Sequence, residues 1–363
     1  MSEWPLVSVV VPMRNEAPTI GALVDGILAQ DYPADRLEVL VVDGDSSDGS
    51  ADIIAAYAAR DRRVRLLRNP RRIVPTALNI AIRAARGEVI CRIDGHTRIA
   101  PDYVRVGVET LRRSGAENVG GPMNAVGGGW FGDAVAAATT SRFGIGSYFH
   151  YGTEEREVDT VYLGMWPRRV FERVGLFDEE LVRNQDDEFN YRLRKAGGRV
   201  LLTPAMHSWY QNRQSLTALL RQYFQYGEWK VRVLQKHPRQ MSWRHFVPPI
   251  FVATLGGLTA LGMVMPLASG AARALAAVYG LAVVVVSVRI AARHGIGAWL
   301  ATALAFASIH LAWGTGFLKG LIAFAGRWRT PETVPPRLEG RGGDTPEPAA
   351  RVAAAAEVIG RTL

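Results

Sequence analysis

Three stretches without a charged side chain lie near the C-terminus, and they restrict the fold more than any other feature of the sequence. They cover residues 246–272, 274–288 and 295–318 of a chain of 363 residues. A helix that crosses a bilayer needs about 20 apolar residues, within a range of roughly 17–25. The first and third stretches meet this requirement, and the second, with 15 residues, is marginal. We therefore expect two or three transmembrane helices within residues 241–325.

Basic residues beside these stretches predict the orientation of the chain. Arg244 and the basic segment 230–239 precede the first stretch, and Arg289 and Arg293 lie between the second and third. Cytoplasmic loops carry an excess of Lys and Arg, so both groups are expected in the cytoplasm. The prediction is a multi-pass protein of the cell membrane with a cytoplasmic N-terminal domain. Cations that follow residue 318 argue against a tail on the far side, so the number of spans stays open.

Residues 1–240 alternate short apolar runs with helical patterns. Strand-like runs lie at residues 6–11, 37–42, 64–67 and 88–93, and helical patterns lie between them. Continuous apolar strands separated by helices predict a mostly parallel sheet that is covered on both faces. Ligands of such sheets bind at the carboxyl ends of the strands. We expect an α/β, Rossmann-like domain over residues 1–240, followed by the membrane region and by a disordered tail over residues 326–363.

Acidic side chains follow two of the predicted strands. Asp43 and Asp45 end one strand, and Asp94 and His96 end another. Asp, Gly and Ser dominate turns, so a turn explains either group alone. Together, the four residues are expected along one rim of the sheet. A carboxylate and an imidazole two residues apart could hold a divalent ion, which would neutralise a departing diphosphate.

Five motifs in this order resemble those of family 2 glycosyltransferases with a GT-A fold. They are Val9-Val10-Val11-Pro12-Met13-Arg14-Asn15-Glu16, Val42-Asp43-Gly44-Asp45-Ser46-Ser47-Asp48-Gly49, Ala77-Leu78-Asn79, Gly87-Glu88-Val89-Ile90 and Arg92-Ile93-Asp94-Gly95-His96. The last motif is most similar to that of the succinoglycan-biosynthesis glucosyltransferase subgroup. The resemblance covers about residues 6–236 and implies a GT-A catalytic domain that is followed by C-terminal transmembrane helices.

The resemblance implies roles for single residues. Those implied for donor binding are Pro12, Glu16, Asp43, Asp45, Asn79, Arg92 and Asp94. Asp94 would be the first acid of the family's Asp-x-Asp metal motif, and His96 stands in place of the second acid. The implied cofactor is a divalent metal, Mn²⁺ or Mg²⁺. Because histidine prefers softer metals than Mg²⁺, the identity of the metal and the dependence on it stay open. A hydrogen-bonding role is the alternative for His96.

A second acidic group predicts the catalytic base. Gln185, Asp186, Asp187 and Glu188 begin a predicted helix, where the helix dipole favours acidic residues, and this alone explains the group. Adjacent carboxylates repel each other, however, so that one pKa can rise toward a value that suits proton abstraction. The segment resembles the family's Glu-Asp motif. In that register Asp186 is the base, and Asp187 is the base if the register shifts by one residue.

Five further residues resemble family positions or lie in a basic, aromatic segment before the first apolar stretch. Trp166 would contact the acceptor, although a packing role is equally consistent. His207 resembles a histidine that closes over the donor diphosphate. Segment 211–236 predicts in part an amphipathic helix in the membrane interface, with Arg221 and Trp229 at headgroup depth. The diphosphate is the alternative partner of its cations, including Lys230.

The sequence as a whole predicts a membrane-bound inverting glycosyltransferase. It would transfer a hexose from a nucleotide sugar, by resemblance a UDP-sugar, to a polyprenyl-linked saccharide in cell-envelope or exopolysaccharide synthesis. A polyprenyl-phosphate glycosyltransferase needs no strong base and is one alternative. A non-catalytic nucleotide-binding membrane scaffold is the other, since His96 and Gln185 depart from the family pattern. The net charge is +9, and we expect the basic residues to bind membrane lipid and the diphosphate rather than nucleic acid.

Overall fold

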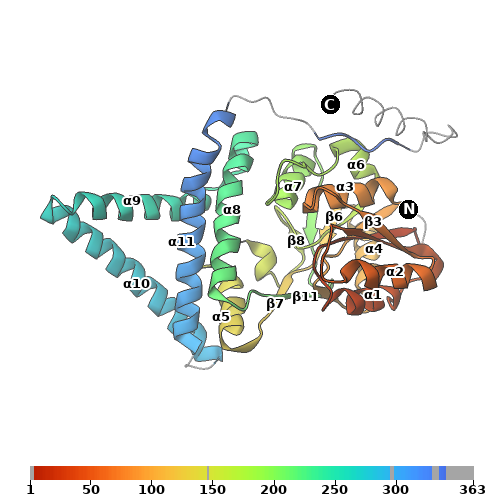
Figure 1. Cartoon of the computed structure of the whole chain (residues 1–363), viewed down its shortest axis with the longest axis horizontal. Helices are drawn as coiled ribbons and strands as arrows, with labels where there is room; N and C mark the ends of the chain where they lie inside the picture. The colour runs from red at the N-terminus through yellow and green to blue at the C-terminus, as the bar shows by residue number, and fades with distance from the viewer. Residues whose placement is uncertain (1–3, 145–146, 295–297, 329–334, 341–363) are drawn as a thin grey trace.

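The computed structural model describes residues 4–144, 147–294, 298–328 and 335–340. An α/β domain lies at one end of the molecule, and a pair of apolar helices projects from the other end (Figure 1). Two long helices lie side by side between these parts, α8 (Leu216–Lys236) and α11 (Trp299–Ala323). The α8–α11 pair therefore separates the α/β domain from the projecting helices.

The α/β domain is built on a sheet of eight strands in the order β3-β2-β1-β4-β9-β6-β10-β8. The strands are β1 (Val7–Met13), β2 (Leu37–Asp43), β3 (Val64–Arg68), β4 (Val89–Arg92), β6 (Asn118–Gly120), β8 (Arg156–Glu157), β9 (Met165–Pro167) and β10 (Val200–Leu202). The four strands expected from the sequence are confirmed, and they are parallel. Strands β8 and β9 run antiparallel to their neighbours, so the sheet is mixed.

A second sheet extends the rim of the first one. Its three strands are β5 (Thr97–Ile99), β11 (Ser208–Gln211) and β7 (Met123–Val126), with β11 in the centre. Strand β5 begins directly after the acidic turn that follows β4, and Tyr210 of β11 pairs with Thr97. The small sheet therefore brings residues near position 210 to the acidic turn.

Helices cover both faces of the large sheet. They are α1 (Ile20–Leu28), α2 (Ser50–Arg60), α3 (Val74–Ala84), α4 (Tyr103–Ser114), α6 (Arg169–Val174) and α7 (Gln185–Lys195), and η2 (Tyr148–His150) is one of several short 3₁₀ turns. Helix α5 (Gly129–Thr139) packs instead with α8 and α11. Alternate residues of a strand point to opposite faces. Val9 and Val11 accordingly pack in a core with α1 and α4, whereas Val10 packs in a second core with α3 and α7.

The apolar stretches form helices that differ from the prediction. The first stretch is broken by a turn between α9 (Val247–Leu261) and α10 (Pro266–His294), so it does not provide a full-length span. The second stretch, which was predicted to be marginal, lies within α10, because Arg273 does not interrupt that helix. The two helices that are long and apolar enough to cross a membrane are residues Pro266–Ala292 and Trp299–Ala323, with mean hydropathies of 2.2 and 1.3.

The tail also departs from the prediction in its described part. Residues 335–340 lie extended against the α/β domain, and the backbone N–H of Leu338 donates to the carbonyl of Phe171 at 3.1 Å. The side chain of Leu338 is buried in the core that contains α3 and α7. The expectation of disorder is therefore wrong for these six residues. Residues 329–334 and 341–363 lie outside the described residues.

Candidate active site

The site lies where β1, β2 and β4 end and where α7 begins. The register of the sheet pairs Met13 with Asp43 at the ends of β1 and β2, and β4 ends at Arg92. Helix α7 begins at Gln185, so Asp186, Asp187 and Glu188 occupy its first turn, as predicted. The side chains of the strand ends and of the helix start meet through Arg92.

Arg92 joins the two acidic groups. Its Nε donates to Oδ1 of Asp94 at 2.8 Å and its Nη2 to Oδ2 at 3.2 Å, while Nη1 donates to the carboxylate of Asp186. The guanidinium is almost fully buried. Burial by itself lowers the pKa of Arg92, but the charges of Asp186 and Asp94 outweigh burial and raise it. One fixed cation therefore brings residues 92 positions apart into a single cluster.

The environments of Asp186 and Asp187 shift the pKa values of the two side chains in opposite directions. Desolvation raises the pKa of Asp186, and Asp94 adds to that rise, whereas Arg92 opposes it. For Asp187, desolvation is outweighed by the buried ammonium of Lys230 in α8, which lowers the pKa. The side chain of Asp186 keeps 39% of its surface exposed, so an acceptor can reach it. Two neighbouring acids whose pKa values are pushed apart are typical of a base beside a structural carboxylate.

His96 is paired with Glu16, which follows β1. Its Nδ1 lies 2.8 Å from Oε1 of Glu16, and its ring meets Tyr210 edge-on at 5.7 Å. Burial lowers the pKa of His96, but the hydrogen bond to Glu16 and the charge of Asp94 outweigh burial and raise it. The alternative role predicted for His96 was a hydrogen bond to a phosphate or a loop carbonyl, whereas its partner in the structure is the carboxylate of Glu16.

The donor set was compared with what a divalent metal requires. Among the described residues, no group of three or more His, Cys, Asp or Glu side chains could hold a metal ion. Mg²⁺ is commonly held by one or two carboxylates together with substrate phosphates. Asp94 and His96 lie two residues apart after β4, and because Nδ1 of His96 is bonded to Glu16, Nε2 is the ring nitrogen that could join the Asp94 carboxylate on such a shared ion. The residues fit a metal that binds together with the donor phosphates.

The rim that was predicted to bind the nucleotide is formed by loops that hydrogen bonds and an ion pair hold in place. Asp43 accepts from the backbone N–H of Ser46, at 3.3 and 3.2 Å to its two oxygens. Asp45 has a left-handed backbone, with φ of 61°, and forms an ion pair with Arg72 that lowers the pKa of Asp45. Pro12 is half-buried at the end of β1. These residues lie on one edge of the cleft, as expected from the strand ends.

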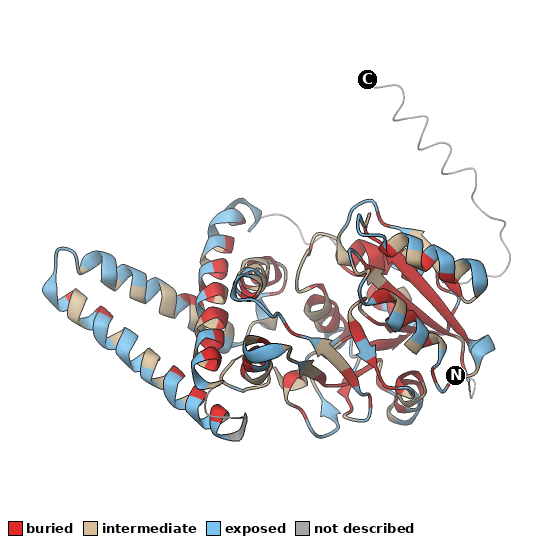
Figure 2. Ribbon diagram, turned by 60° about the horizontal axis from the view of Figure 1, so that its bottom comes forward, coloured by how far each residue is buried: buried red, intermediate tan, exposed pale blue. Residues whose placement is uncertain are grey.

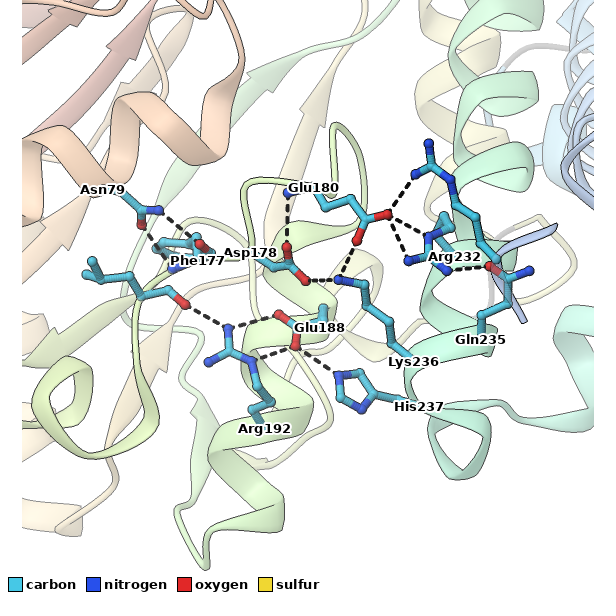
Figure 3. Close-up of polar contacts among 12 residues, drawn as sticks. Asn79, Phe177, Asp178, Glu180, Glu188, Arg192, Arg232, Gln235, Lys236 and His237 are labelled. Atoms are coloured by element: carbon cyan, nitrogen blue, oxygen red, sulfur yellow. Dashed lines mark hydrogen bonds and ion pairs between the residues drawn. The ribbon is translucent and has the colours of Figure 1, made fainter. Parts of the chain in front are cut away.

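Two predicted site residues are structural. Asn79 is fully buried, and its amide bonds both the N–H and the carbonyl of Phe177 at 2.9 Å (Figure 3). Trp166 is also buried, and its ring packs edge-on against Phe171, Phe177 and Phe189. A buried side chain cannot touch a soluble donor or an acceptor, so the donor-binding prediction for Asn79 and the acceptor prediction for Trp166 are wrong.

The residues predicted for the diphosphate or the interface separate in space. Only Lys230 reaches the acidic cluster, through Asp187. His207 lies exposed at the start of β11, where its carbonyl accepts from the N–H of Ala100, and this is the end of β11 away from His96. Trp229 packs on Phe324 at 5.3 Å. Arg221 is exposed and lines a shallow groove between α8 and α11.

Sequence reasoning did not single out Arg213 among the basic residues of its segment. Arg213 follows β11, and its charge acts on the pKa of His96. Its Nε donates to Gln222 of α8 at 3.0 Å. The cation that the structure brings near the acidic turn is therefore Arg213 and not His207. The only sequence signal was the basic character of segment 211–236.

A buried ionic network behind the cluster fixes α7 to the end of α8 (Figure 3). Glu188 accepts from Arg192 and lies 2.9 Å from Nε2 of His237. Beside it, Lys236 contacts Asp178 at 2.5 Å and Glu180 at 2.8 Å. Sequence reasoning missed this network, because charges on helices are usually solvated. The network holds the helix that carries Asp186.

Comparison with known proteins places this geometry among glycosyltransferases. The family model described as glycosyl transferase family 2 matches residues 8–175. The succinoglycan biosynthesis protein ExoA of Rhizobium meliloti (strain 1021) is 33% identical over 332 residues, which cover 88% of this chain and 96% of that protein. A dolichyl N-acetyl-alpha-D-glucosaminyl phosphate 3-beta-D-2,3-diacetamido-2,3-dideoxy-beta-D-glucuronosyltransferase of Methanococcus voltae is 25% identical, over 87% of this chain and 97% of that protein.

Among solved structures, the mannosyltransferase PcManGT of Pyrobaculum calidifontis, in complex with GDP-Man and Mn²⁺, has a similar fold. The TM-score is 0.56, the identity is 24%, and the match covers 88% of each chain. At this identity the likeness concerns the fold alone. It agrees with the α/β domain and the helices that follow it.

Proposed function

The chain belongs to glycosyl transferase family 2 and has the GT-A fold, and we propose that it transfers a hexose from a nucleotide sugar to a lipid-linked saccharide with inversion at the anomeric carbon. The observation that carries the proposal is Arg92, whose guanidinium binds both Asp94 and Asp186. The relatives support the substrate classes, since one is named for succinoglycan biosynthesis and another for a dolichyl-phosphate-linked sugar. A UDP-hexose is the first donor to test.

Asp186 is the proposed general base. Its raised pKa favours proton uptake, and its partly exposed carboxylate can meet an acceptor hydroxyl. The hydroxyl oxygen attacks the anomeric carbon while the bond from that carbon to the diphosphate breaks. The proton passes to Asp186, and the bond electrons leave with the nucleoside diphosphate. Arg92 orients the carboxylate throughout.

Asp187 and Lys230 have a supporting role in this proposal. Their ion pair holds the first turn of α7 against α8, and Gln240 donates to the carbonyl of Asp187 at 2.9 Å. Asp94, with His96 and the donor phosphates, would hold the divalent ion. That ion would supply positive charge for the leaving diphosphate. Arg213 is close enough for its charge to act on His96, and its guanidinium is proposed to bind phosphate.

Membrane attachment completes the proposal. The apolar helices α10 and α11 support attachment to the cell membrane. Arg244 precedes α9 and Arg289 lies near the end of α10, which favours a cytoplasmic catalytic domain by the excess of basic residues on that side. A site beside the membrane can receive a lipid-linked acceptor without extracting the lipid.

The test compares Asp186→Asn with Asp187→Asn in detergent-purified enzyme. The assay is transfer from labelled UDP-glucose, UDP-galactose, UDP-N-acetylglucosamine and GDP-mannose to a membrane lipid extract, with and without Mn²⁺ or Mg²⁺. Loss of a general base lowers the rate by about 10²- to 10⁴-fold, so we expect that loss for Asp186→Asn. Asp187→Asn should retain more activity, with a lower melting temperature.

Three outcomes would contradict this proposal. Wild-type rates in Asp186→Asn with loss in Asp187→Asn would place the base one residue later. Wild-type rates in Asp186→Asn with polyprenyl monophosphate as acceptor would favour a polyprenyl-phosphate glycosyltransferase. Nucleotide binding without turnover of any donor would favour a scaffold.

A further inference from the structure

We propose that the α9–α10 hairpin is the element that enters the bilayer, and that α11 lies in the plane of the membrane beside α8 without crossing it. The proposal rests on the membrane attachment proposed above but not on the chemistry of the site. Length and composition single out α10 and α11 as possible spans. Packing gives a different assignment.

The hairpin projects from the body of the protein and exposes its apolar surface (Figures 1 and 2). Met263, Val264 and Leu267 at the turn keep 82%, 78% and 82% of their surface exposed. Within the apolar window of α10, 17% of the residues are buried. Soluble proteins rarely expose a continuous apolar surface of this extent, because it is unfavourable in water. The hairpin therefore needs an apolar surrounding.

A lipid bilayer suits the dimensions and the base of the hairpin. Helix α9 carries no charge, and with 15 residues at 1.5 Å each it is about 22 Å long, which lies within the roughly 30 Å of the hydrocarbon core. At the base, Trp243 is exposed and the guanidinium of Arg244 lies 5.7 Å from the centre of its ring. Exposed Arg289 lies near the other end of the hairpin. Trp and Arg at this position are typical of headgroup contact.

Arg273 is the charged residue of α10 nearest the tip of the hairpin, and its surroundings are compatible with lipid. Its Nη1 donates to Oγ of Ser269, one turn closer to the tip, at 2.8 Å. The side chain thus extends toward the tip, where its long apolar stem lets the charge reach polar headgroups. An apolar protein partner would leave this cation without such an outlet. The bilayer is therefore the favoured partner.

Helix α11 has the opposite character. In its apolar window 56% of the residues are buried. The exposed Leu and Ile side chains of the helix, Leu300, Leu304, Leu311 and Ile322, form a stripe, and Thr315 and Lys319 are exposed beside it. The spacings of 4, 7 and 11 residues between the Leu and Ile side chains are near whole helical turns, so these side chains share one face. The other face packs on protein. One apolar stripe and one packed face suit a helix that lies in the interface.

Both halves of α11 contact the catalytic domain. In the first half, Phe306 packs edge-on against Phe143 at 5.1 Å, and Nε2 of His310 lies 2.9 Å from the carbonyl of Phe143. In the second half, Lys319 contacts Glu228 of α8 at 2.5 Å. With 25 residues α11 is about 37 Å long, so a spanning α11 would carry one half across the bilayer. These contacts exclude that arrangement.

The chain after α11 returns to the same side. The carbonyl of Phe324 accepts from Gln235 of α8 at 2.8 Å, and Arg327 contacts Glu180 at 2.8 Å. Residues 335–340 then lie on the catalytic domain. Since α9 also begins beside α8 and α11, the chain enters and leaves the membrane on the catalytic side. The hairpin alone has room to insert.

Depth measurements test the proposal. Cys91 is the single cysteine of the chain, and because burial raises the pKa of its thiol, it stays unlabelled in the native protein. Single cysteines are introduced in the hairpin by Thr254→Cys and Leu281→Cys, and along the stripe by Leu300→Cys, Leu311→Cys and Ile322→Cys. Each is labelled with an environment-sensitive fluorophore, and the protein is placed in vesicles with nitroxide lipids, which quench at a shallow or a deep position.

We expect stronger quenching by the deep nitroxide for both hairpin probes. The three probes of α11 should show equal ratios, with stronger quenching by the shallow nitroxide. A Leu311 probe that is deeper than those at both ends would mean that α11 crosses the bilayer, and unquenched hairpin probes would mean that the hairpin lies in water. Either result overturns the proposal. None of these readouts needs turnover, so they stand apart from the test of the function.

A binding assay supplies a second measurement on the full chain. Met263→Asp combined with Val264→Asp should reduce flotation with vesicles at least tenfold while leaving the melting temperature in detergent unchanged. Val126→Asp, at an exposed apolar residue of β7, is the matched control and should float as wild type does. Equal flotation of the tip variant and the control would count against insertion of the hairpin.

Discussion

The buried network behind Asp186 gives a prediction that separates folding from chemistry. Glu188 lies in the first turn of α7, two residues after Asp186, and is almost fully buried. Its carboxylate accepts from Nε of Arg192 at 2.5 Å and from Nη2 at 2.9 Å (Figure 3). Arg192 also donates to the carbonyls of Val174 and Leu176, each at 2.8 Å. Glu188→Gln removes the negative charge and keeps the shape.

The expected loss of stability in Glu188→Gln follows from Arg192, the buried cation that remains. Removing one partner of a buried ion pair costs about 3–5 kcal/mol, and the amide oxygen of Gln can still accept one hydrogen bond, so we expect about 3 kcal/mol. For a domain of 150–250 residues, 1 kcal/mol lowers the melting temperature by about 2–4 °C, which gives a fall of about 6–12 °C. Thermal unfolding of the detergent-purified protein, followed by tryptophan fluorescence, measures the shift.

A second ion pair on α7 provides the control. Arg194 and Asp159 lie 2.6 Å apart with side chains 42% and 81% exposed. Exposed pairs contribute about 0.2–1 kcal/mol, so Asp159→Asn should move the melting temperature by no more than about 4 °C. A Glu188→Gln shift no larger than that of Asp159→Asn would refute the reasoning.

The pH dependence of stability gives the same prediction a second readout. Burial raises the pKa of Glu188, but the hydrogen bond to His237 and the charge of Arg192 outweigh it, so the folded-state pKa is lowered. The resulting stabilisation is present above the unfolded-state pKa and is lost as the pH falls through the folded-state value. Glu188→Gln should remove this acid-side loss. Transfer rate per folded molecule at low temperature should stay within a few-fold of wild type.

Two further predictions concern the base and the α8–α11 contact. Only the ionised form of Asp186 accepts a proton, so kcat/KM should fall as the pH is lowered through the pKa of this residue. Because that pKa is raised, the midpoint of the fall should lie above 3.8, the ordinary aspartate value. A midpoint at or below 3.8 in a pH series would contradict the assignment. A Cβ at Gly316 of α11 would overlap the carbonyl of Phe224, so Gly316→Ala should destabilise the protein by about 1–3 kcal/mol in thermal unfolding. The control is Gly256→Ala in α9, where nothing lies near the added Cβ, and this variant should not destabilise the protein.

The local sequence pattern was sufficient to predict the first four strands of the large sheet, the acidic rim and the start of α7. The runs at the four predicted strands are rich in Val, Ile and Leu, and they form β1 to β4 with the expected direction. Asp43 and Asp94 follow those strands, so their place on the rim could be predicted from strand order alone. The first turn of α7 was equally predictable, because its acidic residues precede a helical pattern.

Contacts between distant segments could not be predicted in this way. Lys230 and Asp187 are separated by 43 positions, and a lysine near an apolar stretch is typical of a headgroup contact. Only packing of α8 on α7 buries this lysine. Asn79 is a second example. Its motif resembles that of donor-binding residues, but its side-chain amide is hydrogen-bonded to the backbone of Phe177, which is 98 positions away. Hydropathy likewise scores α11 as a span, because it counts apolar residues without regard to what covers them.

Helix α8 relates the proposed base to the membrane. Lys230 of α8 forms an ion pair with Asp187, and Gly227, three residues earlier, meets Trp313 of α11 without room for a Cβ. Residues three apart lie about 60° apart around a helix axis, so α7 and α11 contact neighbouring sides of α8, and α8 spaces the proposed base from α11. With α11 in the membrane plane, as proposed above, a saccharide attached to a lipid headgroup could span that spacing while its lipid stays in the bilayer. On the proposed function, the glycine contact and the Lys230–Asp187 ion pair would then set how far the acceptor hydroxyl must extend to reach Asp186.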